Sequence, residues 1–194
     1  MLTNLPPASG ALTNSRERVV LVDPAGTPIG TADKAEVHTT QTPLHLAFSC
    51  YLFDGHGRVL MTRRAGSKAT WPGVWTNTCC GHPAPGETAR AAVERRLRHE
   101  LGIAATELRL VLPRFAYRAT DAAGIVENEL CPVWVGRVDH VTVDPDPAEV
   151  MDLAWVEWDD LTTAAQATPF LLSPWCVLQV RELAALDQRE ELPA

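Results

Sequence analysis

The chain has 194 residues and a mass of 21.2 kDa, which is the size of one ordinary domain and enough to bury a substantial core. Hydrophobic residues make up 46% and charged residues 21%, so the composition excludes a disordered or fibrous protein. The formal net charge of −7 argues against a nucleic-acid-binding protein, which is normally basic.

We expect no membrane span, because the longest nearly apolar stretch covers only residues 44–53 whereas a spanning helix needs about 20 residues. The first fifteen residues have no basic region followed by an apolar one, which indicates a polar tail rather than a secretion signal. The five cysteines form no Cys-x-x-Cys pair and favour free thiols. We predict a cytoplasmic protein with a flexible tail over 1–16, one domain over 17–187 and a C-terminal tail over 188–194.

The first half of the chain predicts strands. Four segments are apolar or extended and are bounded by turn residues: 18–23, 44–53, 58–63 and 71–80. The sequence Asp-Gly-His-Gly at 54–57 predicts a hairpin turn between the second and third of these strands.

A helix is predicted over 87–101, with Gly102 as its terminator. Its apolar residues recur at helical spacing: Ala89, Ala92, Val93, Leu97 and Leu101. Three further strands are predicted after it, over 108–117, 126–138 and 151–158. A last helix is predicted to start with Ser173 as N-cap and Pro174 at the first helical position, and to continue to about residue 186. These elements predict an α/β (α+β) protein.

Positive charge gathers in one part of this net-negative chain. Residues 58–98 hold eight basic and two acidic side chains. Such a concentration predicts a binding site for a compact anion, and the alternative is a solvated charged helix face.

One spaced motif covers the predicted loop at 81–86 and the helix that follows. Its residues are Gly81, Glu87, Arg95, Leu97, Glu100, Gly102 and Ile103. This arrangement resembles the Nudix box, G-x5-E-x7-R-E-U-x-E-E-x-G-U, where U is aliphatic. Arg96 and His99 stand where the box has two glutamates, which in Nudix hydrolases help to hold the metals that activate water. The resemblance implies a Nudix-like mixed β-sheet sandwich flanked by helices, and the two replacements argue against ordinary hydrolysis.

Further motifs single out one family of this superfamily. They are Arg63-Arg64 followed by Lys68, residues 71–77, Cys80-Gly-His82-Pro, Tyr117-Arg-Ala-Thr, Glu127-Asn-Glu129 and Ser173-Pro-Trp175. Together they are similar to type I isopentenyl diphosphate isomerase over about residues 34–175. The resemblance implies metal-dependent interconversion of isopentenyl and dimethylallyl diphosphate through a tertiary carbocation, which feeds isoprenoid biosynthesis. The expected partner is a small isoprenoid diphosphate, with no nucleic acid or membrane, and we expect a monomer.

The resemblance also implies a metal site made of three imidazoles and two carboxylates: His38, His45, His82, Glu127 and Glu129. Glu127 and Glu129 are two positions apart on a predicted strand, so their side chains leave the same face. This ligand set suits Mn²⁺ or Mg²⁺, and Zn²⁺ also accepts it. For any single histidine the alternative is a surface or hydrogen-bonded residue, and His56, His99 and His140 keep that interpretation because they match no ligand position.

For the diphosphate, the family positions are Arg64, Lys68 and Arg96, with Lys34 as an addition. One arginine guanidinium can donate two parallel hydrogen bonds to two phosphate oxygens, whereas a lysine ammonium acts as a point charge. Glu87 is expected to hold a second Mg²⁺ that arrives with the diphosphate. The alternative for Glu87 is a charge at a helix start, stabilised by the helix dipole.

For the proton transfers, the resemblance supplies Cys80 and Glu129 on opposite sides of a flat hydrocarbon, and the order in which they act stays open. Trp175 is expected to face the carbocation and Tyr117 to hydrogen-bond Glu129. Trp71 and Trp75 are expected to form an apolar roof that excludes water. The alternatives are a buried inert thiol and ordinary core aromatics, and Cys79 receives no role.

Two other functions stay open at this point. One is a Nudix hydrolase of a nucleoside diphosphate derivative, which phosphate release would reveal. The other is a non-catalytic diphosphate-binding module, although binding alone needs no thiol and carboxylate across an apolar pocket.

Overall fold

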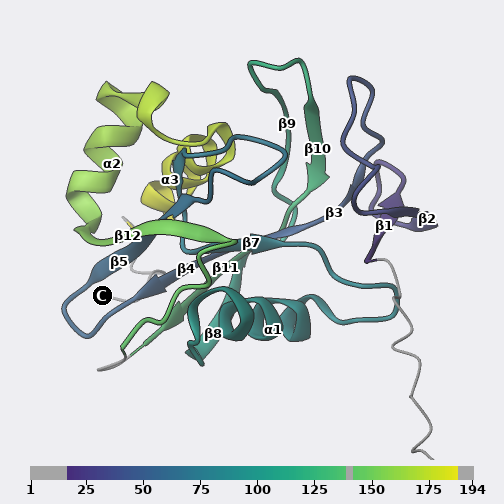
Figure 1. The fold of residues 1–194 in the computed structure, drawn as a ribbon. Helices are drawn as coiled ribbons and strands as arrows, with labels where there is room; N and C mark the ends of the chain where they lie inside the picture. Colours follow the sequence, from purple (N-terminus) through teal and green to yellow (C-terminus); the bar gives the residue numbers. More distant parts are fainter. Residues whose placement is uncertain (1–16, 139–141, 188–194) are drawn as a thin grey trace, which may run out of the picture.

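Two mixed β-sheets form the centre of the computed structural model, which describes residues 17–138 and 142–187 (Figure 1). The larger sheet has the strand order β12 (Val150–Glu157), β5 (Arg58–Arg64), β4 (Phe48–Phe53), β11 (Val133–Arg137) and β8 (Thr106–Leu112), with β6 (Trp75–Thr76) paired to β5 and β7 (Cys79–Gly81) to β4. The smaller sheet has the order β2 (Pro28–Asp33), β1 (Arg18–Val22), β3 (His45–Leu46), β10 (Val126–Leu130) and β9 (Ala116–Thr120). The tails predicted at 1–16 and 188–194, and His140, lie outside the described residues.

Helices cover both faces of the larger sheet (Figure 1). They are α1 (Ala89–Leu101), α2 (Trp158–Ala167) and α3 (Pro174–Asp187), with a 3₁₀ turn, η1 (Pro169–Leu171), between the last two. Every residue of β4 is buried, and the side chains alternate: Tyr51 and Phe53 pack with α2 and α3, whereas Phe48 and Leu52 pack with α1. The arrangement confirms the predicted mixed β-sheet sandwich flanked by helices.

Two segments predicted as single strands are each divided between the two sheets. Residues 44–53 form β3 and β4, and residues 126–138 form β10 and β11. Pro132 has no N–H to donate to a ladder. On either side of this break, the Ala47 N–H donates a hydrogen bond to the Leu130 carbonyl at 2.9 Å and the Ser49 N–H donates one to the Pro132 carbonyl at 3.1 Å. The two parallel pairs, β3 with β10 and β4 with β11, therefore pass from one sheet to the other together.

Other boundaries also differ from the prediction. The segment 108–117 contains β8 and β9, which lie in different sheets and are separated by a turn at Pro113. Strand β2 was not predicted, because its residues are mostly exposed and lack an apolar pattern. Helix α2 was also missed: it begins at Trp158, which was predicted as strand, and carries Asp159 and Asp160 in its first turn.

The helix ends follow the predicted signals closely. Helix α1 begins two residues later than predicted, because Thr88 caps it by accepting the Ala91 N–H at 3.2 Å. Gly102 ends it in the left-handed conformation, with φ of 67°. Ser173 caps α3 through the Cys176 N–H at 3.3 Å. No helix within the described ranges is long and apolar enough to cross a membrane.

Candidate active site

The strand registers place the predicted site residues in two neighbouring rows. In the smaller sheet, Glu129 on β10 pairs with His45 on β3 and with Tyr117 on β9. In the larger sheet, Cys80 on β7 pairs with Ser49 on β4. Since β3 continues into β4 across the break at Ala47, the two rows lie next to each other. The division of the two predicted strands therefore brings the row that contains Glu129 next to the row that contains Cys80.

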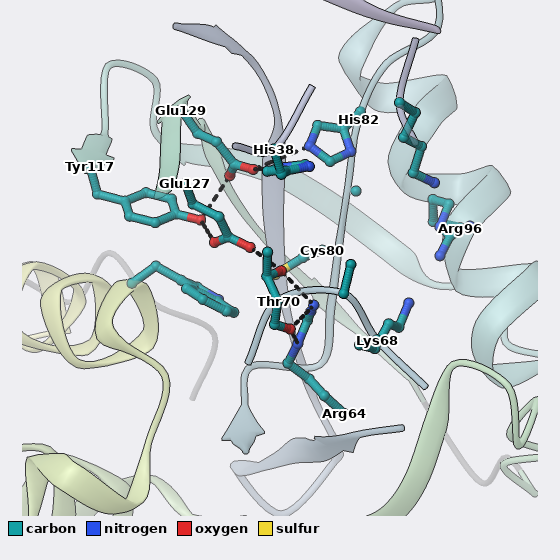
Figure 2. Close-up of a pocket in the computed structure, with 14 residues that line it drawn as sticks. His38, Arg64, Lys68, Thr70, Cys80, His82, Arg96, Tyr117, Glu127 and Glu129 are labelled. Carbon is teal, nitrogen blue, oxygen red and sulfur yellow. Dashed lines mark hydrogen bonds and ion pairs between the residues drawn. The ribbon is translucent and has the colours of Figure 1, made fainter. Parts of the chain in front are cut away.

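A pocket of about 220 Å³ opens between these rows (Figure 2). It is lined by Lys34, His38, Arg64, Lys68, Ala69, Thr70, Cys80, Gly81, His82, Arg96, Tyr117, Glu127, Glu129 and Trp175. In Figure 2 the carboxylates and Tyr117 lie at one end of this pocket, and Arg64, Lys68 and Arg96 lie at the other. Of the predicted site residues, His45 and Glu87 are not part of the lining.

Three histidines and one carboxylate converge at the first end. Donor atoms of His38, His45, His82 and Glu129 all lie within 4.8 Å of one another. The Glu129 Oε1 atom is 3.1 Å from His82 Nε2 and 3.5 Å from His45 Nε2. His45 Nδ1 must donate to the Pro43 carbonyl at 2.9 Å, so in the neutral ring Nε2 carries the lone pair that can bind a metal. His38 Nε2 is buried without a hydrogen-bond partner. These donors fit a divalent metal ion.

The protonation states of His82 and Glu129 support the same interpretation. Burial lowers the pKa of His82 to about 4, against the opposing effect of Glu129, which leaves the imidazole neutral. Burial disfavours ionised Glu129, but its interactions with the neighbouring His38, His45 and His82 outweigh it and hold its pKa well below the usual range. Burial also disfavours the charged form of His45, yet the hydrogen bond and charge of Glu129 raise its pKa. Neutral imidazole and ionised carboxylate are the forms that bind metal.

Glu127 lies beside this cluster but has other partners. Its Oε1 accepts from Thr70 Oγ1 at 2.6 Å, and its Oε2 lies 2.5 Å from the Tyr117 hydroxyl. Tyr117 also reaches Glu129 at 2.9 Å, which is the hydrogen bond predicted from the sequence. Burial, followed by the charge of Glu129, raises the pKa of Glu127. Its role as a metal ligand stays a prediction.

The four predicted diphosphate ligands all line the pocket. Arg96 is buried and donates to Glu100 at 2.8 and 2.5 Å, and its guanidinium lies 3.1 Å from Glu149. Lys68 pairs with the same Glu149. Sequence reasoning missed Glu149, which lies 81 positions from Lys68 and matches no motif, whereas Glu100 is part of the box. These carboxylates hold the two cations in fixed positions.

The other two cations are also held in place. Arg64 donates to the Thr70 carbonyl at 3.1 and 2.9 Å. Lys34 pairs with Glu17 at 2.5 Å. Each of the four cations is therefore held by at least one partner within the protein.

Glu87 lies outside the pocket lining. Both of its oxygens accept from Arg95 at 2.8 Å, and Oε2 also accepts the Ala84 N–H at 2.9 Å. The hydrogen bond from Arg95 is the largest influence on Glu87 and lowers its pKa. Its predicted contact with a second Mg²⁺ stays a prediction.

The apolar wall is made by Trp175, whose side chain is only 2% exposed. The centroid of its ring lies 5.7 Å from the ring centroid of Tyr117 and 5.4 Å from that of Trp71. The guanidinium carbon of Arg64 lies 5.5 Å from the Trp175 ring centroid. Trp71 and Trp75, predicted as a roof, are not among the lining residues, and Trp71 contributes by supporting Trp175.

Cys80 lies in the middle of the pocket (Figure 2). Its thiol is 3.1 Å from Asn77 Oδ1 and 3.4 Å from Ser49 Oγ. Burial raises its pKa to about 11, so the group is a thiol at neutral pH. Cys79 is buried on the opposite side, in the cluster that packs against α1. All five cysteines are free.

This chain is similar to known proteins over most of its length. The NUDIX domain family matches residues 43–176. The curated isopentenyl-diphosphate Delta-isomerase of Frankia alni is 56% identical over 175 residues, which cover 90% of this chain and 90% of the relative. The protein of the same name from Paenarthrobacter aurescens is 57% identical over 170 residues, 88% of this chain and 92% of the relative.

Solved structures agree on the fold. A crystallised protein of Deinococcus radiodurans has a TM-score of 0.67 at 20% identity and covers 86% of this chain and 98% of its own. The MutT protein of Methanosarcina mazei has a TM-score of 0.59 at 16% identity, covering 77% and 97%. Sequence and fold together show that the chain belongs to the Nudix domain family and, within it, to the family of isopentenyl-diphosphate Delta-isomerases.

Proposed function

We propose that this protein interconverts isopentenyl diphosphate and dimethylallyl diphosphate, with Cys80 and Glu129 as the proton-transfer pair. The names of its relatives support the reaction. One observation supports the pair: the Cys80 thiol and the Glu129 carboxylate line one pocket, which also carries four basic side chains, and three of them, Arg64, Lys68 and Arg96, lie at the end away from Glu129. An anion held at the basic end directs its hydrocarbon tail between the thiol and the carboxylate.

Substrate binding follows from the charges. The diphosphate interacts with four basic side chains: Lys34, Arg64, Lys68 and Arg96. Each of them is held in place by a partner in the protein: Glu17 for Lys34, Thr70 for Arg64, Glu149 for Lys68 and Glu100 for Arg96. Arginine forks match phosphate oxygens, so the guanidinium groups fix the orientation of the diphosphate. The five-carbon tail then lies against Trp175 and Tyr117.

The chemistry moves one double bond by one carbon position. The electron pair of the terminal double bond takes a proton from one member of the pair, which forms a methyl group and leaves a tertiary carbocation. The other member then removes a proton from the carbon two positions away, and the electrons of that C–H bond form the new double bond. The Cys80 thiol is protonated and can donate at neutral pH, whereas Glu129 is ionised and can accept.

The surroundings of the pair stabilise the cation and position the base. The Trp175 ring offers its electron-rich face to the cation, worth about 2 kcal/mol or more when water is excluded. The Tyr117 hydroxyl lies 2.5 Å from Glu127 and 2.9 Å from Glu129, so its one proton is shared between the two carboxylates and positions Glu129 at the pocket. His38, His45, His82 and Glu129 would hold a divalent metal, whose positive charge would favour the ionised form of the carboxylate.

Finer assignments belong to this proposal. We infer that Mn²⁺ or Mg²⁺ binds the histidine cluster, with Zn²⁺ as the alternative, and that Glu127 joins as a ligand when the metal is present. A second Mg²⁺ accompanies the diphosphate and contacts Glu87. We also infer a cytoplasmic monomer that acts on a small molecule. The pocket is lined by residues of a single chain, which supports the monomer.

Incubation with isopentenyl diphosphate in deuterated water, followed by NMR, tests the proposal. We expect dimethylallyl diphosphate with deuterium in the newly formed methyl group, and loss of conversion when a chelator removes the metal. Rapid phosphate release from nucleoside diphosphate derivatives, with no conversion of isopentenyl diphosphate, would instead establish a hydrolase. Arg96 opposes that outcome because its guanidinium lies between Glu100 and Glu149, at a box position that hydrolases fill with a carboxylate.

A further inference from the structure

We propose that Asn77 is a positioning residue that fixes the Cys80 thiol and the Trp175 indole relative to each other. This inference rests on the proposed function, in which both side chains act on the substrate. Asn77 is 0% exposed and lies between β6 and β7, and it is not part of the pocket lining. It therefore acts on the substrate through its neighbours.

The Asn77 side-chain oxygen is the point where the two groups meet. Oδ1 accepts from the Trp175 indole Nε1 at 3.1 Å and from the Cys80 thiol at 3.1 Å. Thr76 Oγ1 also donates to it at 2.9 Å. One buried oxygen thus connects the thiol on β7 with the aromatic wall on α3, although Cys80 and Trp175 are 95 positions apart in the chain.

The orientation of this amide is determined by its partners. Its nitrogen Nδ2 donates to the Cys50 carbonyl at 3.1 Å and to the Cys79 carbonyl at 2.8 Å. Carbonyl oxygens only accept and the indole N–H only donates, so a flipped amide would lose all three bonds. The acceptor oxygen is therefore directed at Cys80 and Trp175 without an alternative.

A second buried group holds the other side of the sulfur. Ser49 Oγ lies 3.4 Å from the Cys80 sulfur and 3.4 Å from the Cys131 sulfur. Gln179 Nε2 donates to Ser49 Oγ at 2.9 Å, and its own Oε1 accepts from the Tyr51 hydroxyl at 2.9 Å. Because Ser49 accepts from Gln179, its own proton is free to point at a sulfur. Cys80 is held between an acceptor and a donor.

This arrangement predicts a defined loss when Asn77 is removed. The thiol would be free to rotate away from the substrate carbon, and the indole N–H would lose its partner. A misplacement of about 1 Å typically costs about 100-fold in turnover. We expect Asn77→Ala to lower kcat by about that factor. The KM for isopentenyl diphosphate should stay within about 3-fold, because the Asn77 side chain hydrogen-bonds Thr76, Cys50, Cys79, Cys80 and Trp175 and none of the four pocket cations.

Thr78→Val is the matched control. Thr78 is also 0% exposed, donates to the Leu60 carbonyl at 2.6 Å and accepts the Leu52 N–H at 2.9 Å, so these side-chain hydrogen bonds involve neither Cys80 nor Trp175. Both variants should unfold at lower urea concentration than the unmodified protein. Only Asn77→Ala should lose turnover. Turnover of Asn77→Ala near that of the unmodified protein, or an equal loss in Thr78→Val, would overturn the proposal.

The infrared S–H stretching band of Cys80 gives a reading that does not depend on turnover, and its position in the unmodified protein is informative even if Asn77→Ala does not fold. Subtracting the spectrum of Cys80→Ser isolates the band. In the unmodified protein it should lie at the lower frequency of a thiol that donates to an amide oxygen, move up in Asn77→Ala and stay in place in Thr78→Val. A band of a free thiol in the unmodified protein overturns the proposal. If the unmodified protein fails to isomerise, the proposed function fails, and the band still supports or overturns the positioning by Asn77.

Discussion

At the scale of single residues, Cys79 and Cys80 are adjacent in the chain but differ in their surroundings because of the geometry of a β-strand. Successive side chains of a strand point to opposite faces. On β7, Cys80 therefore lines the pocket, while Cys79 is 2% exposed in the cluster against α1. Burial raises the pKa of Cys79 well above its usual range, so it is an inert thiol.

Serine substitutions at these two positions should separate the roles. Cys80→Ser keeps the size of the side chain but replaces the thiol by a far weaker acid, and we expect kcat to fall by about 10²–10⁴-fold. Diphosphate binding should change little, because Arg64, Lys68 and Arg96 keep their partners. Steady-state kinetics with isopentenyl diphosphate measures both quantities.

Cys79→Ser is the control for this measurement. Its hydroxyl replaces a buried thiol away from the pocket, so it should lower stability modestly and leave kcat within about 3-fold. If Cys79→Ser abolished turnover while Cys80→Ser kept it, the assignment of the thiol would be reversed.

Some residues of the site could be predicted from the sequence and others could not. Motif resemblance placed Lys34, Arg64, Lys68 and Arg96, and the structure shows all four at the pocket. Glu149, the carboxylate partner of Lys68 and Arg96, and the buried amide of Asn77 could not be assigned in this way. Glu149 matches no motif, and Asn77 acquires its role only when α3 packs against β6 and β7.

At the scale of elements, the break in two strands decides where the site forms. Apolar patterning predicted the segments 44–53 and 126–138 as strands, because both halves of each segment are buried and extended. The division between sheets depends on pairing partners far away in the chain, and only Pro132 marked one of the breaks. Local sequence therefore predicts the existence of these strands but not the sheet to which each half belongs.

The hairpin between β4 and β5 allows a prediction about stability and pH. Asp54 Oδ1 accepts the backbone N–H groups of His56 and Arg58 at 2.9 Å, and Oδ2 accepts Arg58 Nε at 2.8 Å. Burial disfavours the Asp54 carboxylate, but these bonds and the Arg58 charge outweigh it and lower its pKa. Asp54→Asn keeps the shape and loses the charge, so it should reduce the free energy of unfolding at pH 7 by about 1–2 kcal/mol.

The pH dependence of that loss follows from the direction of the shift. A carboxylate whose pKa is lower in the folded state stabilises the protein fully above its unfolded pKa and loses this effect as the pH falls through the folded pKa. The difference between Asp54→Asn and the unmodified protein should therefore be constant near neutrality and shrink below about pH 4. Urea unfolding at several pH values measures it. Asp121→Asn, in a turn with similar backbone bonds but no arginine on the carboxylate, is the control and should show a smaller loss. Equal losses in both variants would contradict the role of Arg58.

At the scale of the whole molecule, the histidine cluster joins distant parts of the chain. His38 lies in the segment between β2 and β3, His45 on β3, His82 directly after β7, and Glu129 on β10. The sequence resemblance predicted these residues, whereas their convergence within 4.8 Å depends on the complete fold. A metal ion that binds this cluster binds the folded chain and not the unfolded one, so it should stabilise the protein.

Removal of the metal should therefore lower stability and activity together. At a free metal concentration about 100 times the Kd, binding contributes about 2.7 kcal/mol. For a chain of this length that corresponds to a fall in Tm of about 5–10 °C when a chelator is added. His82→Ala should show reduced metal content by mass spectrometry, a low Tm and no further response to the chelator. His56→Ala, which changes an exposed histidine in the β4–β5 turn, should keep the full metal content and the full response. If His82→Ala retained its metal and its chelator-sensitive Tm, His82 would not be a ligand, and the cluster would have to bind through His38, His45 and Glu129 alone.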